Sequence, residues 1–274
     1  MASPVIQVDV LIPSVGRSSL EQARASTQRA LLPSDEVELI LHVVEDPKRL
    51  GPAWARNQAA RQGSAAFLAL LDDDDVWLPG RLTGALRVLQ ARPEVAFVCG
   101  EALPREGGLF LAGDPRGTGR PQTISPGDHT HGDLADDCFV AASSVTLRRA
   151  DWEEANGMPE QLKQAEDYAL WLALTRGGRP VHVLPDALCR LRAGTTFGAS
   201  DDAGEAARSS LAALRGFAAP ETVTNARVGT LLATQALHAR RAGRRSESQS
   251  LALESLRRHP RSVLGWKAAL RSLL

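Results

Sequence analysis

The chain has 274 residues, 43% of them hydrophobic and 23% charged, which is typical of a globular protein and excludes wholesale disorder. The 32 basic and 32 acidic residues cancel, so no global positive field attracts nucleic acid and we expect no nucleic-acid partner. Three cysteines without a C-x-x-C spacing exclude a disulfide framework and a zinc knuckle. No signal peptide and no apolar run of ~18 residues is recognised, so we expect a cytoplasmic protein.

The first hundred residues alternate between patterns typical of strands and patterns typical of helices. Four apolar runs predict strands, at residues 5–12, 37–44, 66–71 and 95–99. Helices are predicted between them, at residues 18–32, 52–62 and 79–91. Ser18 and Glu21 form a capping-box pattern at the start of the first helix. This alternation predicts an α/β fold, Rossmann-like, with a mostly parallel sheet flanked by helices.

The chain changes character after residue 100. Residues 101–137 are rich in Gly, Pro, Asp and Thr and predict a loop or a short hairpin. Further strands are predicted at residues 139–147, 181–184 and 187–191, and helices at residues 151–155 and 164–177. From Ala203 onward the patterns are all helical, with breaks at Pro220 and Pro260.

Three polar segments follow three of the predicted strands, at the ends where an α/β sheet binds ligands. They are residues 13–17, residues 45–46 and the four consecutive aspartates at 72–75. Like charges this close raise one another's pKa unless a cation lies among them. Carboxylate oxygens are ligands that Mg²⁺ and Mn²⁺ prefer, so the aspartates predict a divalent metal site. The alternative is a solvated acidic turn that caps the next helix.

A pair of acidic residues, Glu166 and Asp167, opens the helix predicted at residues 164–177. Acidic side chains favour helix N-termini through the helix dipole, by ~0.3–1 kcal/mol, which suffices to explain one of them. The functional alternative is a general base, a carboxylate that takes a proton from an attacking hydroxyl. The pattern leaves both interpretations open.

Five segments, in the same order along the chain, resemble motifs of the family 2 glycosyltransferases, which are inverting enzymes of the GT-A fold. The segment LDDDDVWLP at 71–79 resembles the D-x-D motif. The segments at 10–14 and 51–57 resemble the nucleotide-binding turn and the G-x-x-x-A-R-N helix. The segments at 142–149 and 165–172 resemble the strand before the acceptor region and the E-D motif that carries the catalytic base.

This resemblance covers roughly residues 5–192. It implies transfer of a sugar from a nucleotide-diphosphate donor to an acceptor hydroxyl, with inversion and with a divalent metal, Mn²⁺ or Mg²⁺. The donor would be a UDP-, GDP- or dTDP-sugar, and the acceptor a glycan, a lipid-linked molecule or a small molecule. Asp167 would be the general base and Asp74 the metal ligand. The nucleotide-binding residues would be Pro13, Val15, Arg17, Asp46, Asn57, Asp72 and Asp73. The residues near the acceptor would be Glu166, Ser144 and Trp152.

The resemblance also implies a GT-A-like catalytic domain at residues 1–195, with a nucleotide-binding half at 1–100 and an acceptor half at 101–195. A helical C-terminal extension would follow at residues 196–274. Its last predicted helix, 261–274, carries an apolar face beside basic residues. This face predicts packing on the catalytic domain, a homodimer contact, or peripheral contact with the inner face of the membrane, where a lipid-linked acceptor would be met.

Two departures from the family pattern keep alternative functions open. The segment from Asp46 to Ala55 is short, and residues 189–194 lack the histidine that many members carry, for which His129 and His131 are candidates. A catalytically degenerate binding module of the same fold would fit these departures. A sugar nucleotidyltransferase would instead need a Gly-rich loop after the first strand, where residues 13–17 hold a single glycine.

Overall fold

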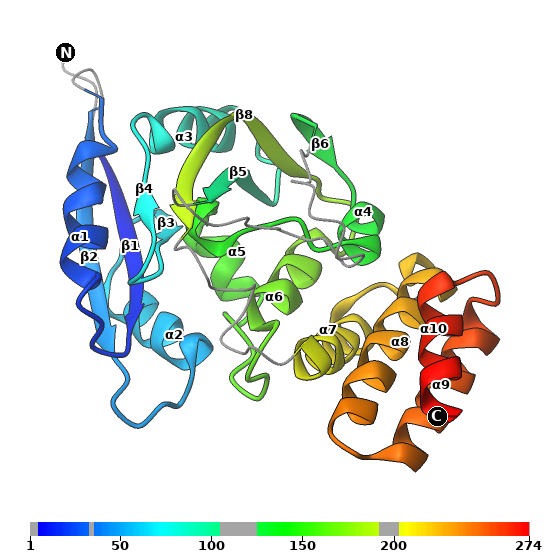
Figure 1. The fold of residues 1–274 in the computed structure, drawn as a ribbon. Helices are drawn as coiled ribbons and strands as arrows, with labels where there is room; N and C mark the ends of the chain where they lie inside the picture. The colour runs from blue at the N-terminus through cyan, green and yellow to red at the C-terminus, as the bar shows by residue number, and fades with distance from the viewer. Residues whose placement is uncertain (1–4, 33–35, 105–124, 192–202, 274) are drawn as a thin grey trace.

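The computed structural model describes residues 5–32, 36–104, 125–191 and 203–273 (Figure 1). Its centre is one sheet of eight strands, in the order β2-β1-β3-β7-β5-β8-β4, with β6 paired to β8. The strands are β1 (Ile6–Ser14), β2 (Val37–Glu45), β3 (Phe67–Leu70), β4 (Val76–Trp77), β5 (Phe97–Pro104), β6 (Gly127–His129), β7 (Thr146–Arg148) and β8 (Val181–Leu191). The helices of the first two hundred residues are α1 (Leu20–Arg29), α2 (Pro52–Gln62), α3 (Arg81–Ala91), α4 (His131–Asp136), α5 (Arg149–Glu154) and α6 (Glu166–Thr175).

The sheet is mixed, and its long pairings are parallel. β1 pairs in parallel with β2 and β3, and β5 pairs in parallel with β8. The short strand β7 lies antiparallel between β3 and β5, while β4 and β6 pair antiparallel with β8. Because β7 is antiparallel to both of its neighbours, β3 and β5 run in the same direction. The predicted α/β class, mostly parallel and flanked by helices, is confirmed.

Helices cover both faces of the sheet, which explains why its central strands are apolar throughout. Successive side chains of β1 point to opposite faces. Leu11 packs in the cluster that contains Ala59 of α2 and Trp171 of α6. Val10 packs in the cluster that contains Ala23 of α1 and residues of α3. The two layers therefore hold the carboxyl ends of β1, β2 and β3 at one edge of the sheet.

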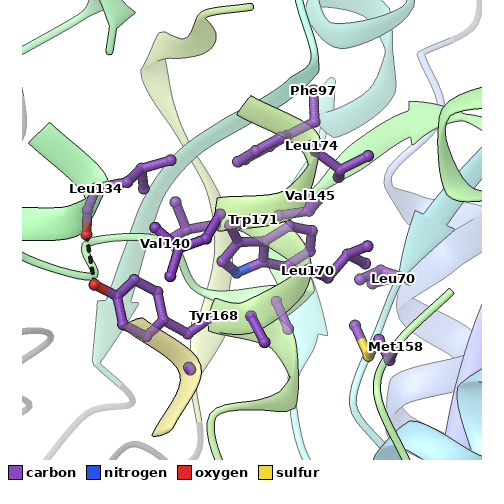
Figure 2. Packing of buried hydrophobic residues seen from close by; sticks show 14 of the residues in the cluster. Leu70, Phe97, Leu134, Val140, Val145, Met158, Tyr168, Leu170, Trp171 and Leu174 are labelled. Atoms are coloured by element: carbon purple, nitrogen blue, oxygen red, sulfur yellow. Dashed lines mark hydrogen bonds between the residues drawn. The ribbon is translucent and has the colours of Figure 1, made fainter. Parts of the chain in front are cut away.

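Helix α6 is apolar on all sides and is buried in the larger cluster (Figure 2). Trp171 is fully buried and its ring lies 4.9 Å from the ring of Phe97 in β5. The hydroxyl of Tyr168 donates to the carbonyl oxygen of Leu134 in α4, at 2.8 Å. This packing fixes the position of the two acidic residues with which α6 begins.

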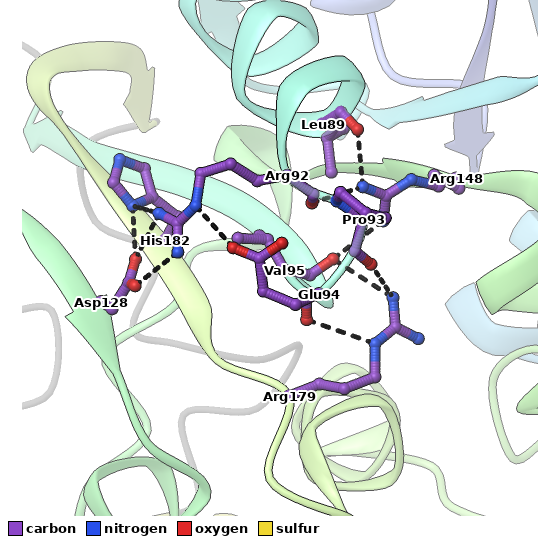
Figure 3. Close-up of polar contacts among 9 residues, drawn as sticks. All are labelled: Leu89, Arg92, Pro93, Glu94, Val95, Asp128, Arg148, Arg179 and His182. Atoms are coloured by element: carbon purple, nitrogen blue, oxygen red, sulfur yellow. Dashed lines mark hydrogen bonds and ion pairs between the residues drawn. The ribbon is translucent and has the colours of Figure 1, made fainter.

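The opposite edge of the sheet is closed by a network of charged side chains (Figure 3). Arg92, which follows α3, contacts Asp128 of β6 at 2.7 Å, and Asp128 contacts His182 of β8 at 2.6 Å. Arg148 and Arg179 donate to backbone carbonyls at the end of α3 and just beyond it, including that of Val95. These contacts tie α3 to the sheet away from the carboxyl ends of β1 and β3.

The predicted capping box at Ser18 and Glu21 is wrong. A turn precedes α1, so the helix begins at Leu20, its N-cap is Ser19, and the Ser19 hydroxyl makes no capping bond. A capping box is instead found at α4. The Asp133 backbone N–H donates to Thr130 Oγ1 at 3.2 Å, and the Thr130 N–H donates to Asp133 Oδ2 at 2.7 Å.

The strand predicted at residues 139–147 is mostly absent. A 3₁₀ turn, η1 (Ala142–Ser144), bends the chain, and the strand β7 begins only at Thr146. The buried side chain of Arg81 stabilises this bend, because its guanidinium donates to the carbonyls of Ser143 and Val145 and to the Thr146 hydroxyl.

The other differences concern the edge of the sheet. The two strands predicted at 181–184 and 187–191 form one strand, β8, paired irregularly with β5 near Glu101. The loop predicted at 101–137 contains the end of β5, then β6 and α4, and its residues 105–124 lie outside the described residues. The two-residue strand β4 was not expected, since a run this short carries no periodic pattern.

The C-terminal part is helical, as predicted. It comprises α7 (Ala203–Phe217), the short turn η2 (Pro220–Thr222), α8 (Asn225–Arg241), α9 (Arg245–Arg258) and α10 (Val263–Leu273). α7 lies between α6 and α8, and α10 packs on α8 and α9 through small buried residues (Figure 1). Within the described part of the chain, no helix has the length and apolar character needed to cross a membrane.

Candidate active site

Three polar segments that are far apart in the sequence meet at the carboxyl ends of β1, β2 and β3. The turn after β1 contacts the acidic segment after β3 through Asp73, which accepts from the Ser14 hydroxyl at 2.9 Å and from the Val15 N–H at 3.2 Å. The backbone N–H of Asp46, after β2, donates to the carbonyl of Ser14 at 2.8 Å. The predicted convergence of these segments is therefore observed.

Each of the four aspartates has a different environment. Asp73 is buried and its Oδ1 lies 2.6 Å from Arg17 Nη1, so this residue ties the β1 turn to the acidic segment. Asp74 lies 3.2 Å from the same guanidinium. Asp75 accepts from the Ser143 hydroxyl at 2.6 Å. Asp72 is the most exposed of the four, with 33% of its side chain accessible, and it lies 2.5 Å from Arg56.

Arg56 connects the acidic segment to the start of α6. Its buried guanidinium contacts Asp72 at 2.5 Å and Glu166 at 3.2 Å. Burial lowers the pKa of Arg56, but the charges of Asp72 and Glu166 outweigh burial and hold the pKa above its usual range. The guanidinium is therefore a permanent positive charge between two carboxylates that lie 94 residues apart in the sequence.

The acidic pair at the N-terminus of α6 is perturbed by its surroundings. Burial, and then the charge of Asp167, raises the pKa of Glu166. Burial also raises the pKa of Asp167, although Arg56 and the backbone N–H of Tyr168, which donates to Asp167 Oδ1 at 2.7 Å, act in the opposite direction. One carboxylate oxygen of Glu166 contacts the Arg56 guanidinium, whereas Asp167 is half-buried beside Glu166. Such perturbed carboxyls cluster at functional sites.

One carboxylate oxygen of Asp46 is buried without a hydrogen-bond partner among the described residues. Its side chain is 3% exposed, and Oδ2 accepts from the Gly51 N–H at 2.7 Å at the start of α2. Oδ1 is buried and has no hydrogen-bond partner within the described residues. An unpaired buried acceptor is costly, by about 1–3 kcal/mol, so this oxygen suits a ligand N–H donor.

The carboxylate oxygens of the acidic segment suit a divalent cation that is also bound by the phosphate oxygens of a substrate. Within the described residues, no group of three or more His, Cys, Asp or Glu side chains is arranged to hold a metal ion. Mg²⁺ commonly uses one or two carboxylates together with phosphate oxygens, and Asp74 with Asp72 offers such oxygens. The histidine alternative is wrong for His131, because its Nδ1 contacts the Thr175 hydroxyl at 2.8 Å and its Nε2 accepts from the Ala219 N–H.

Three predicted site residues serve the packing of the chain. Asn57 holds the loop after α5, since its side chain bonds both the N–H and the carbonyl of Met158, at 2.9 Å each. Ser144 is fully buried and donates to the carbonyl of Ala141. Trp152 is 4% exposed within the main core. The acceptor contacts implied for Ser144 and Trp152 stay predictions.

Two residues of the site were absent from the predicted set. Arg56 lies in the A-R-N motif, where a charged side chain among alanines on a buried helix was the available signal. Ser143 accepts from the Asp72 N–H at 3.1 Å and donates to Asp75, and no local pattern distinguishes it from its neighbour Ser144. Of the other predicted residues, Val15 is 52% exposed and Pro13 is partly buried at the end of β1.

Comparison with known proteins decides the family. Residues 25–142 match the model of the family described as glycosyl transferase family 2. The chain belongs to this family. The fold of this family 2 glycosyltransferase resembles a mannosyltransferase from Pyrobaculum calidifontis solved with GDP-Man and Mn²⁺, with a TM-score of 0.56, 17% identity, and coverage of 99% of this chain and 88% of that one. That likeness concerns the fold, which is of the GT-A type.

Two sequence relatives support the family. The glycosyltransferase is 25% identical over 198 residues to the amylovoran biosynthesis glycosyltransferase AmsE of Erwinia amylovora, over 65% of this chain and 71% of AmsE. It is 28% identical over 130 residues to WfgD of Escherichia coli, a UDP-Glc:alpha-D-GlcNAc-diphosphoundecaprenol beta-1,3-glucosyltransferase. That match spans 46% of this chain and 45% of WfgD, less than half of either. The chain is thus a nucleotide-sugar-dependent glycosyltransferase, and the sugar nucleotidyltransferase alternative is dropped.

Proposed function

We propose that this glycosyltransferase moves a sugar from a nucleoside-diphosphate donor to an acceptor hydroxyl with inversion, assisted by a divalent cation. The observation that carries the proposal is the Arg56 bridge between Asp72 and Glu166. It brings the acidic segment after β3, suited to a diphosphate and its cation, next to the acidic pair at the start of α6, suited to a base. A donor and an acceptor bound between them would be within reach of both.

The donor site lies at the carboxyl ends of β1, β2 and β3. The exposed Val15 side chain and Pro13 would form the surface for the nucleobase, and the orphaned Asp46 Oδ1 would accept from a base N–H. Arg17, 39% exposed at its side chain, would turn from Asp73 and Asp74 toward the diphosphate. The bound cation, Mn²⁺ or Mg²⁺, would neutralise the charge of the leaving diphosphate. We propose Asp74 as its main protein ligand.

The acceptor side is provided by α6. Asp167 would take the proton of the attacking hydroxyl, whose oxygen attacks the anomeric carbon on the face opposite the leaving diphosphate. A single displacement of this kind inverts the anomeric configuration. Glu166 would hold Arg56 in place and so orient Asp72. The names of AmsE and WfgD favour an acceptor in polysaccharide or lipid-linked glycan synthesis. The donor would be a UDP-sugar, as in the name of WfgD, or a GDP- or dTDP-sugar.

We retain the division into a catalytic domain at 1–195 and a helical extension at 196–274 as part of this proposal. Its boundary lies outside the described residues. A place at the inner face of the membrane also belongs to the proposal, because a lipid-linked acceptor would be found there.

The test is calorimetric titration of UDP, GDP and dTDP, with and without Mn²⁺ or Mg²⁺. Asp74→Asn should abolish the metal-dependent part of nucleotide binding and leave the melting temperature similar or higher, since one of four clustered charges is removed. Asp128→Asn, at the opposite edge of the sheet, is the matched control and should bind like wild type. Equal binding by Asp74→Asn and wild type would refute the assignment. Tight donor binding without release of nucleoside diphosphate in any acceptor mixture would favour the degenerate binding module.

A further inference from the structure

Helix α10 turns its large apolar side chains away from the protein. Val263, Trp266, Leu270 and Leu273 are 83%, 55%, 62% and 67% exposed. Their spacing of three and four residues puts them on one side of the helix. We call these four residues the α10 stripe. The side that packs on α8 and α9 carries small residues, Gly265, Ala268 and Ser272, which are buried.

The distribution of side chains on α10 is the reverse of that on an ordinary surface helix, which buries its large apolar residues and exposes polar ones. The α10 stripe is therefore not needed to close the helical bundle. Contiguous exposed apolar residues of this kind mark contacts with a protein or a lipid surface. The indole N–H of Trp266 donates to the carbonyl of Pro260 at 2.9 Å, so the ring is held in its outward position.

The charge around the stripe is strongly positive. Residues 225–274 contain ten Arg and Lys against two Glu, although the whole chain is neutral. Lys267 and Arg271 flank the stripe on α10 itself. Arg240 donates to the carbonyl of Arg271 at 3.0 Å, and Arg245 donates to that of Leu273 at 2.5 Å, so two more guanidinium groups lie at the C-terminal end of the helix.

The two acidic residues of this region lie on α9 and are already paired. Glu247 contacts Arg244 at 2.9 Å, and Glu254 contacts Arg258 at 3.0 Å. They therefore do not neutralise the basic residues beside the stripe. The α10 stripe is therefore an apolar surface that contains a tryptophan and is bordered by basic side chains.

We propose that the α10 stripe docks this protein on an anionic lipid surface. The apolar side chains would enter the boundary between headgroups and acyl chains, and the basic border would bind anionic headgroups. Tryptophan favours this boundary because its ring is apolar and its N–H is polar. A second copy fits less well, because two stripes facing each other would bring two strongly basic surfaces together. The stripe lies outside the candidate active site, so docking and sugar transfer can be measured separately.

Vesicles of phosphatidylglycerol and phosphatidylcholine in equal parts, compared with pure phosphatidylcholine vesicles, test the proposal. The full chain should cosediment with the anionic vesicles, weakly with the neutral ones, and less as salt is added. Trp266 is exposed, whereas the four other tryptophans are buried or half-buried. Its fluorescence should therefore shift to the blue and be quenched by brominated lipid, and Trp266→Phe should remove most of this signal.

Matched variants separate the two contributions. Val263→Ser with Leu270→Ser should weaken binding to anionic vesicles by at least tenfold, whereas Val5→Ser, at an exposed valine on the sheet domain, should not. Lys267→Gln with Arg271→Gln should weaken binding on the order of tenfold at low salt. The exposed pair Arg29→Gln with Arg61→Gln should have little effect.

Two results would overturn the proposal. One is a wild-type chain that binds nucleotide by calorimetry, and is thus folded, yet fails to bind anionic vesicles. The other is a dimer in analytical ultracentrifugation that Val263→Ser converts to monomer, which would assign the stripe to a second copy. Failure of nucleotide binding with intact vesicle binding would instead contradict the proposed function alone.

Discussion

The two acidic residues at the start of α6 differ in what they contact. Glu166 is buried and holds the Arg56 guanidinium, while Asp167 is half-buried and accepts from the Tyr168 N–H. Neighbouring positions on a helix point about 100° apart, so one of them at most faces a reacting hydroxyl. The contacts favour Asp167 as the base and Glu166 as a positioning residue.

This assignment predicts different kinetic effects for two conservative variants. Asp167→Asn keeps the shape of the side chain and removes the proton acceptor, so kcat should fall by ~10²–10⁴-fold with donor affinity nearly unchanged. Glu166→Gln should reduce kcat less and should also weaken donor binding, because the Arg56 bridge to Asp72 loses a charge. Steady-state transfer and calorimetric donor binding are the measurements. A larger loss of kcat in Glu166→Gln would move the base to Glu166.

The same pair sets the expected pH dependence. The base must be deprotonated, so the transfer rate should fall as the pH falls through its pKa. Burial raises the pKa of Asp167, so this loss should occur at a higher pH than the ~3.9 of an exposed aspartate. The raised pKa values of both acids favour the folded state at acid pH, and this contribution disappears as the pH rises through them. A rate profile that is flat down to about pH 4 would contradict the assignment.

At the scale of elements, the 3₁₀ turn η1 supports the acidic segment. Its Ser143 accepts from the Asp72 N–H and donates to Asp75, and Arg81 holds the Ser143 carbonyl. Burial lowers the pKa of Arg81 to about 9, yet the side chain stays protonated at neutral pH and stacks 4.3 Å from the Trp77 ring. The hydrogen bonds of Arg81 within the described residues go to the carbonyls of Ser143 and Val145 and to the Thr146 hydroxyl, so this buried arginine serves to hold η1 and the start of β7.

This arrangement predicts that two adjacent serines differ. Ser143→Ala removes both bonds to the acidic segment and leaves a carboxylate with fewer donors, so it should cost about 2 kcal/mol and weaken metal-dependent nucleotide binding. Ser144→Ala is the control, since its hydroxyl donates only to the Ala141 carbonyl, which also accepts from the Ser144 N–H. Denaturant unfolding and calorimetry would measure both effects. Equal loss of nucleotide binding in the two variants would refute the role of η1.

At the scale of the whole molecule, the chain is neutral but unevenly charged. The last fifty residues carry the basic excess described above, so residues 1–224 carry an equal acidic excess. The bundle α8–α10 contacts the sheet domain through α7, which packs on α6, and through α8, whose Arg227 lies 3.6 Å from Asp137. The donor site is thus structurally separate from the proposed lipid-binding helix.

Removal of residues 261–274 is expected to separate the two activities. Donor binding and donor hydrolysis should remain largely intact, because no part of α10 contributes to the segments after β1, β2 and β3. The bundle should lose stability, because the deletion uncovers Ala233, Ala236 and Ala252. Transfer to a lipid-linked acceptor in vesicles should fall, while transfer to a soluble analogue should not. An equal loss with both acceptors would show that α10 only supports the fold.

The sequence alone was sufficient for features that depend on short-range patterns. Apolar runs predicted β1, β2, β3 and the start of β5, and their alternation with helices predicted the α/β class. The carboxyl ends of parallel strands share an edge, so the meeting of Asp46, Asp73 and the β1 turn also followed from the order of the elements.

Only the tertiary structure decided which side chains meet across long separations and which faces are covered. Arg56 joins Asp72 and Glu166, and Ser143 rather than Ser144 reaches the acidic segment. Trp152 enters the core although its sequence context is that of a surface helix, while Trp266 points outward. The physical reason is that periodicity and strand direction are local properties of the chain. The partner of a buried charge, by contrast, depends on how several elements pack together.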